Sequence, residues 1–299
     1  MLNIVDFKLS DIIIEKLLMA NNIPQAIKLA DFAIHMTNGV LNCELICSVL
    51  NSVKNDKKEN INIDFHCVID LIDYLEKNFF DTDKVIELEK KYFYVLKLHS
   101  KAPERLYECI SKNPDVFIEF LKGGFKKTNK SKKILNEDEK KFAEFCFELL
   151  YNWKKVPGYS NNKLDVEYLK NWFYSVKEKS IQIDRYESAM AIIGAMLFHV
   201  PEDPSGLFMD PSVAKILDDE KKDSIRNAYA CEVVNSRGVY FVDPTGRPEF
   251  ELEKKYEKRA TEIDELGFFR FAQTLRDIAK SFHFEAVSNI EQEKKWREV

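Results

Sequence analysis

The stretch from Asn113 to Gly124, NPDVFIEFLKGG, contains the signals that decide the fold. Asn113 belongs to the residue types that cap helix N-termini, Pro114 has a φ angle already suited to a first turn, and Asp115 puts negative charge at the positive end of the helix dipole. Apolar residues follow with helical spacing until a glycine pair stops the pattern. The stretch therefore predicts a helix with a defined start and a defined end.

The same helical spacing covers most of the chain on both sides of this stretch. It recurs in segments of about 10–20 residues and ends with two closing helices at about 248–263 and 268–287. The 299 residues include only nine glycines and nine prolines, whereas turn-rich β folds need more of both. The sequence thus predicts an all-α fold, either an irregular solenoid-like helical array or two stacked helical bundles.

The clearest interruption of the helical pattern is KGGFKKTNKSKK at 122–133. We place a lysine-rich linker loop here, between an N-terminal helical half at 1–121 and a C-terminal helical half at 134–299. Five lysines of this loop are candidate phosphate contacts in a nucleic-acid complex: Lys126, Lys127, Lys130, Lys132 and Lys133. A solvated loop without a ligand is the favoured interpretation.

A second interruption, VVNSRGVYFVDPTGRPE at 233–249, has two glycines, two prolines, two arginines and a short apolar run. Its Pro-Thr-Gly step has the composition of a turn, so we expect a small non-helical or hairpin insertion near 235–247. Arginine binds carboxylates and phosphates in bidentate fashion. The candidate binding residues lie in this insertion: Asn235, Arg237, Tyr240, Asp243 and Arg247.

Composition narrows the class of protein further. The chain has 45 basic and 50 acidic residues, while dedicated nucleic-acid binders usually carry net positive charge. No stretch approaches 18 uncharged apolar residues and the N-terminus lacks a signal-peptide pattern, so we expect no membrane association. The six cysteines are interpreted as reduced, buried thiols of a cytoplasmic protein.

Motifs that carry chemistry are not found in the sequence. It contains no P-loop, no dinucleotide-binding glycine pattern, no nucleophile elbow and no His-Glu-x-x-His. Cys43 and Cys47 lie four residues apart, with His66 and Cys67 as further zinc ligands, but this spacing matches no standard zinc module. We therefore expect no catalytic residue, no metal and no cofactor.

Several blocks of sequence occur in an order that resembles a known group. VIDLIDYLE, ELEKKYFYVL and APERLYECISKNPDVFIEFL come first, then LLYNWKKVPG, LDVEYLKNWF and IGAMLFHVPEDPSGLF, then VVNSRGVYF, ELEKKYEKRATEI and TLRDIAKSFHFEA. Together they resemble the C-terminal α-helical region of large uncharacterised bacterial proteins, some from gene clusters connected with anti-phage defence. The resemblance implies a bacterial, cytosolic, helical scaffold, either a stand-alone version or a C-terminal fragment, with any effector domain elsewhere.

Three functional hypotheses follow. The favoured one is a protein-interaction scaffold or sensor subunit of a bacterial multi-component system, with anti-phage defence as one such system and with protein partners or self-association. The second is a nucleic-acid-binding module that uses the 122–133 lysines with Arg237 and Arg247. The third is a hydrolase-type enzyme with a site built from the acids near 202–210 and the segment 235–249.

Overall fold

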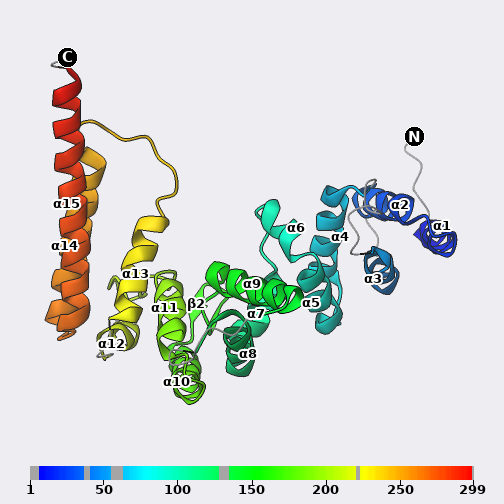
Figure 1. Cartoon of the computed structure of the whole chain (residues 1–299), viewed down its shortest axis with the longest axis horizontal. Coiled ribbons are helices and arrows are strands. Elements are labelled where there is room, and N and C mark those ends of the chain that lie inside the picture. The colour runs from blue at the N-terminus through cyan, green and yellow to red at the C-terminus, as the bar shows by residue number, and fades with distance from the viewer. Residues whose placement is uncertain (1–6, 37–40, 55–62, 128–134, 220–222, 298–299) are drawn as a thin grey trace. The chain divides into compact units, whose positions relative to one another are not determined.

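The computed structural model describes residues 7–36, 41–54, 63–127, 135–219 and 223–297. Within these residues the chain forms fifteen helices and one two-stranded sheet, which confirms the all-α prediction (Figure 1). The chain divides into two compact units, Met1–Cys109 and Ile110–Val299. No helix in the described part is both long enough and apolar enough to cross a bilayer.

The N-terminal unit is built from helices that pack on their near neighbours in the chain, α2 against α3 and α4 for example. Its helices are α1 (Phe7–Met19), α2 (Ile23–Met36), α3 (Cys43–Ser52), α4 (Phe65–Asn78), α5 (Thr82–Lys91), α6 (Phe93–Leu98) and the first part of α7 (Glu104–Lys112). Neighbour-to-neighbour packing is the arrangement of solenoid-like arrays.

Helix α4 illustrates why these segments are helical. Asp64 caps the helix by accepting a hydrogen bond from the backbone N–H of His66. Val68, Leu71, Ile72 and Leu75 follow at intervals of three and four residues and are all buried. They form one apolar stripe that faces the core of the unit.

The C-terminal unit contains the remaining elements. They are α8 (Pro114–Gly124), α9 (Glu137–Asn152), β1 (Tyr159–Ser160), β2 (Lys163–Leu164), α10 (Val166–Gln182), α11 (Tyr186–Leu197), α12 (Pro211–Asp219), α13 (Ser224–Asn235), α14 (Arg247–Glu265) and α15 (Phe269–Arg297). The last two form a long antiparallel pair, and α12 and α13 pack against α15 (Figure 1). Both closing helices are longer than the sequence pattern indicated.

The division between the units falls at 109/110, whereas the sequence pattern placed the boundary at 122–133. Helix α8 packs with the C-terminal unit, since the Phe117 ring centroid lies 5.6 Å from that of Trp153 and 5.3 Å from that of Trp172. The glycine pair that suggested a linker serves helix packing instead. A Cβ atom on Gly124 would lie 2.6 Å from the backbone nitrogen of Phe147, so only glycine lets α8 approach α9 this closely.

The predicted insertion is non-helical but is not the hairpin. Residues 236–246 connect α13 to α14 without regular structure, while the strand pair lies at β1 and β2, with Tyr159 opposite Leu164. Asn161 and Asn162 form the hairpin turn with φ angles of 49° and 57°. Asparagine tolerates this left-handed conformation, and two such residues make the tight turn that suits a two-residue hairpin.

The cysteines are free thiols, but they are not uniformly buried. Cys47 and Cys146 are buried, whereas Cys43, Cys67 and Cys109 are half-buried and Cys231 is exposed. Cys231 departs from the prediction because it lies on the face of α13 that borders an open groove.

Candidate functional site

Arg237, in the turn that follows α13, anchors the connection between α13 and α14. Its guanidinium donates hydrogen bonds to Glu249 Oε1 at 2.7 Å and to Glu285 Oε2 at 2.8 Å. The guanidinium carbon also lies 3.9 Å from the centroid of the Tyr240 ring and 5.2 Å from that of Phe282. Arg237 thus ties the connection to the first turn of α14 and to the middle of α15 through charge and aromatic contact.

The partners of Arg237 are buried to different degrees. Glu249 is only 1% exposed, and its second oxygen makes no hydrogen bond in the part of the chain that the structure describes. Burial acts to lower the pKa of Arg237, but its contacts with Glu285 and Glu249 outweigh this and raise the pKa overall. Arg237 therefore stays charged and neutralises a carboxylate that is removed from water.

Tyr240 completes the cluster. Its hydroxyl donates a hydrogen bond to Glu285 Oε1, and this bond raises the pKa of the phenol. Because the ring also covers the Arg237 guanidinium, the backbone on either side of Tyr240 is held close to α15. We call Arg237, Tyr240, Glu249 and Glu285 the anchor cluster.

The far end of the connection is fixed by a close backbone approach. Gly246 has φ of 64°, and a Cβ atom there would lie 2.7 Å from the carbonyl oxygen of Ala286. Asp243 orders the preceding turn, because its Oδ1 accepts hydrogen bonds from the backbone N–H and the hydroxyl of Thr245. These bonds lower the pKa of Asp243, and they show that its carboxylate serves to stabilise the turn.

The five candidate binding residues thus have different surroundings. Arg237 and Tyr240 belong to the anchor cluster, and Asp243 shapes a turn. Arg247 is exposed and pairs with Glu251 one helical turn away, at 3.0 Å. Asn235 lies at the end of α13 and lines a groove. Both arginines already have carboxylate partners, which reduces their availability for phosphate.

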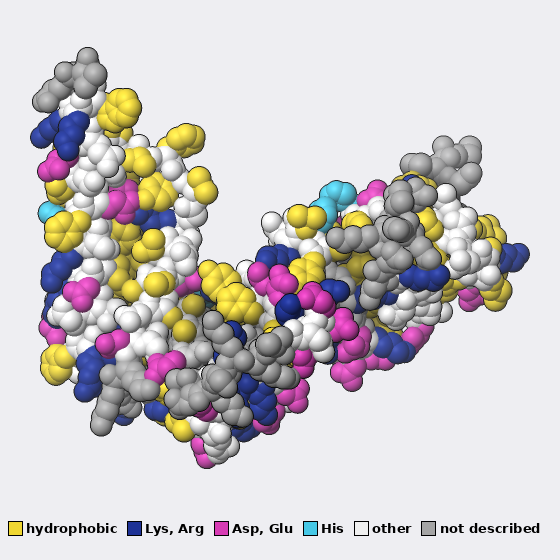
Figure 2. All heavy atoms as spheres, in the orientation of Figure 1, with side chains coloured by type: hydrophobic (Ala, Val, Ile, Leu, Met, Phe, Trp, Pro, Cys, Tyr) yellow, Lys and Arg dark blue, Asp and Glu magenta, His cyan; other side chains and the backbone are white. Residues whose placement is uncertain are grey.

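Between the two fixed ends lie four consecutive exposed apolar residues, of which Val239, Phe241 and Val242 project into solvent while the Tyr240 ring packs on Arg237. Val239 and Phe241 are fully exposed, Val242 is 58% exposed and Tyr240 is 42% exposed. No hydrogen bond joins the backbone of 239–242 to the rest of the described chain. Figure 2 shows hydrophobic side chains along this connection, beside the helical pair α14 and α15. We call Val239–Val242 the apolar run.

An apolar groove lies next to the start of the connection. It has a volume of about 420 Å³ and is bordered by α9, α11 and α13. Its apolar lining comes mainly from Phe125, Phe147, Leu150, Ile192, Ala195 and Ala228. The groove has no local signal in the sequence, because its residues are spread over more than a hundred positions and become neighbours only when three helices pack.

One rim of the groove is charged and firmly held. Glu232 on α13 accepts hydrogen bonds from Lys154 Nζ at 2.9 Å and from His199 Nε2 at 2.9 Å. Partial burial acts to raise the pKa of Glu232, but these two donors outweigh burial and lower it. The groove therefore combines an apolar floor with an ionised, ordered rim, as in surfaces that bind an amphipathic helix of a partner.

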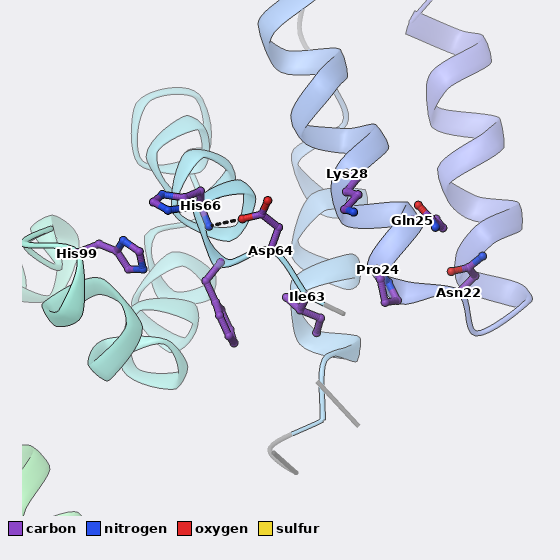
Figure 3. Close-up of a pocket in the computed structure, with 9 residues that line it drawn as sticks. Asn22, Pro24, Gln25, Lys28, Ile63, Asp64, His66 and His99 are labelled. Carbon is purple, nitrogen blue, oxygen red and sulfur yellow. Dashed lines mark hydrogen bonds between the residues drawn. The ribbon is translucent and has the colours of Figure 1, made fainter. Parts of the chain in front are cut away.

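The N-terminal unit has a more polar cavity of about 750 Å³. Figure 3 shows His66 and His99 on one side and Lys28 and Gln25 on the other. The two imidazole rings meet edge to face with centroids 4.6 Å apart. Asp64 is turned toward its own helix as the cap of α4. The two histidines and Asp64 have these structural partners, and the residues that line the cavity do not assemble a nucleophile with a base.

The lysine-rich segment is only partly described. Lys126 and Lys127 are exposed after the end of α8. Lys130, Lys132 and Lys133 lie outside the described residues. Arg185 donates hydrogen bonds to the carbonyl oxygens of Phe125 and Lys122, so the C-terminus of α8 is capped by a fixed arginine.

The acids near 202–210 do not join the segment at 235–249. Glu202 pairs with Arg259 at 3.2 Å, and Glu262 accepts a hydrogen bond from the backbone of Phe208. Both contacts lie toward the C-terminal end of α14, whereas Glu249 lies in its first turn. Ten residues of helix separate Glu249 from Arg259, which is about 15 Å along the axis. Within the described residues, these contacts therefore do not bring together the two segments of the hypothetical hydrolase site.

Three side chains that contact Arg237 are not among the candidate binding residues chosen from the sequence: Glu249, Phe282 and Glu285. Comparison of the chain with protein-family models, with curated proteins and with solved structures found no match. The candidate site is therefore defined by its own geometry, as an apolar run held on a buried ionic anchor beside an apolar groove.

Proposed function

We propose that this chain is a protein-interaction scaffold, the scaffold or sensor subunit of a bacterial multi-component system, and that it binds its partner through the apolar run Val239–Val242. The observation that carries the proposal is the exposure of four consecutive apolar side chains on an ordered base. Isolated exposed apolar residues are ordinary in soluble proteins, but contiguous ones mark interaction surfaces.

The energetics favour a protein partner. Burial of a valine or phenylalanine side chain contributes about 1.5–3 kcal/mol, so the run can supply a large share of a micromolar affinity. The anchor cluster and Gly246 hold both ends of the connection in the free chain. Such preorganisation reduces the entropy lost on binding. The free backbone groups of the run can also pair with an edge strand of the partner.

The groove gives the same surface a second contact area. Cys231, Glu232 and Asn235 on the last turns of α13 border it, and the connection begins directly after Asn235. A partner that binds the apolar run can therefore also contact the groove. The interface expected from these features has an apolar centre and a charged rim, which is the usual anatomy of protein interfaces.

The proposal is tested by affinity purification from the native host with the wild-type chain and with Val239→Ser/Phe241→Ser. We expect the wild-type chain to recover specific partner proteins. The double variant should recover about one tenth or less of the amount of partner that the wild type recovers. The matched control is Phe80→Ser, because Phe80 is also fully exposed but stands alone between α4 and α5.

Self-association is examined on the same proteins by sedimentation velocity. A wild-type dimer that the double variant converts to monomer would make a second copy of the chain the partner. Equal partner recovery by the wild type and the double variant, with no change in sedimentation, would refute the proposal.

A further inference from the structure

We propose that Asp31 and His35 on α2, together with Asp70 on α4, form a binding site for a divalent transition-metal ion such as Zn²⁺. One ligand-capable atom from each of these side chains lies within 4.8 Å of both others. Within the described residues this group, and not the Cys43–Cys47 pair with His66 and Cys67, is the one that converges.

Helix geometry explains the convergence. Asp31 and His35 are four residues apart, so they lie on one face of α2. Helix α4 packs against α2 and brings Asp70 to that face. The three ligands thus come from two packed helices, which is a common way to build metal sites in helical proteins.

The orientation of the histidine suits a ligand. His35 Nδ1 lies 2.9 Å from the carbonyl oxygen of Asp31, and this contact favours the tautomer with the proton on Nδ1. In that tautomer Nε2 has the free lone pair, and Nε2 faces Asp70 Oδ2 at 3.8 Å. A histidine that donates one N–H to a carbonyl and presents the other nitrogen is the usual arrangement at metal sites.

The carboxylates supply charge and an unused acceptor. Asp31 Oδ1 is buried and accepts no hydrogen bond in the described part of the chain, although it lies within ion-pair distance of His35 Nδ1, at 3.3 Å. Two carboxylates neutralise the charge of a divalent ion. Ligand atoms around Zn²⁺ lie about 3.4 Å apart, so closing on the ion requires side-chain shifts of about 1 Å.

The donor set selects the class of ion. One imidazole nitrogen and two carboxylates fit Zn²⁺, Co²⁺ or Mn²⁺, with water in the remaining positions. Ca²⁺ and Mg²⁺ prefer oxygen ligands alone, so the histidine disfavours them.

The test uses the full chain without a histidine tag, first stripped with a chelator. Zn²⁺ binding is followed by isothermal titration calorimetry and Co²⁺ binding by visible absorption. We expect one equivalent of ion, with weak visible Co²⁺ bands and no intense near-ultraviolet thiolate band. His35→Gln and Asp70→Asn should each weaken binding at least tenfold, while circular dichroism shows an unchanged helical content.

The matched control is His283→Gln, because His283 Nδ1 also faces a carboxylate, Glu253, at 3.1 Å. This variant should bind the ion as the wild type does. Absence of binding up to about 100 µM ion, or equal binding by the wild type and His35→Gln, would overturn the proposal. Loss of binding in His66→Gln alone would also overturn it, by assigning the ion to the His66–His99 pair.

Discussion

At the scale of single residues, Arg237 has the clearest structural role in the candidate site. The pattern of glycines, prolines and arginines predicted that this segment departs from the helices. The structure shows which acidic residues pair with Arg237. Glu249 and Glu285 lie 12 and 48 residues away, and helical spacing alone does not reveal that they face Arg237.

Arg237→Ala should destabilise the C-terminal unit by about 3–5 kcal/mol, because it leaves the buried carboxylate of Glu249 without a cation. Arg247→Ala should change stability by less than about 0.5 kcal/mol, since this arginine forms only an exposed pair. Urea unfolding followed by tryptophan fluorescence measures both, because all three tryptophans lie in the C-terminal unit. Similar decreases in the free energy of unfolding of the two variants would contradict the role assigned to Arg237.

Glu89 makes the stability of the N-terminal unit depend on pH. Burial, reinforced by the neighbouring Glu76 carboxyl, raises the pKa of Glu89 to about 8 from 4.5. Its two oxygens also accept hydrogen bonds from the backbone N–H groups of Arg105 and Leu106, at the start of α7. The folded state therefore holds a proton that the unfolded state releases at lower pH.

The sign of the effect follows from linkage. The contribution of Glu89 to stability is complete below pH 4.5 and is lost as pH rises to about 8, because the unfolded chain binds fewer protons over that range. Urea unfolding followed by far-ultraviolet circular dichroism should show this decline, and Glu89→Gln should flatten it. A steeper dependence in the variant, or stability that rises with pH through this window, would be inconsistent with the assignment.

At the scale of elements, the joint between α13 and α14 depends on backbone geometry at Gly246. Gly246→Ala adds a Cβ atom 2.7 Å from a carbonyl oxygen of α15 at a left-handed φ angle, so we expect a loss of about 2–4 kcal/mol. Gly238 has nearly the same φ, 61°, but open space around it. Gly238→Ala should therefore cost only about 1 kcal/mol. Thermal unfolding of both variants distinguishes the effect of the steric clash from that of backbone strain. Equal losses of stability in the two variants would exclude the clash.

Much of the element pattern was predictable from sequence, and the exceptions have physical causes. Caps such as Asn113 and apolar spacing such as that in α4 are local signals, so the helices and the all-α class follow from them. The glycine pair at 123–124 was misleading as a boundary signal, because glycine also permits close helix packing. The apolar groove depends on contacts between distant helices and leaves no local signal in the sequence.

At the scale of the whole molecule, each unit has its own buried apolar residues, and the two proposed sites lie in different units. The partner site belongs to the C-terminal unit and the metal site to the N-terminal unit. Metal binding and partner binding can therefore be tested independently, and the failure of one proposal leaves the other standing.

The central proposal is that the apolar run Val239–Val242 binds a protein partner. The most direct measurement places a photo-crosslinking amino acid at position 241 in the native host and compares it with the same amino acid at position 80, another fully exposed phenylalanine. We predict a discrete protein adduct at 241 that is absent at 80 and is lost when Val239→Ser is added. No adduct at 241, or the same adducts from both positions, would contradict it.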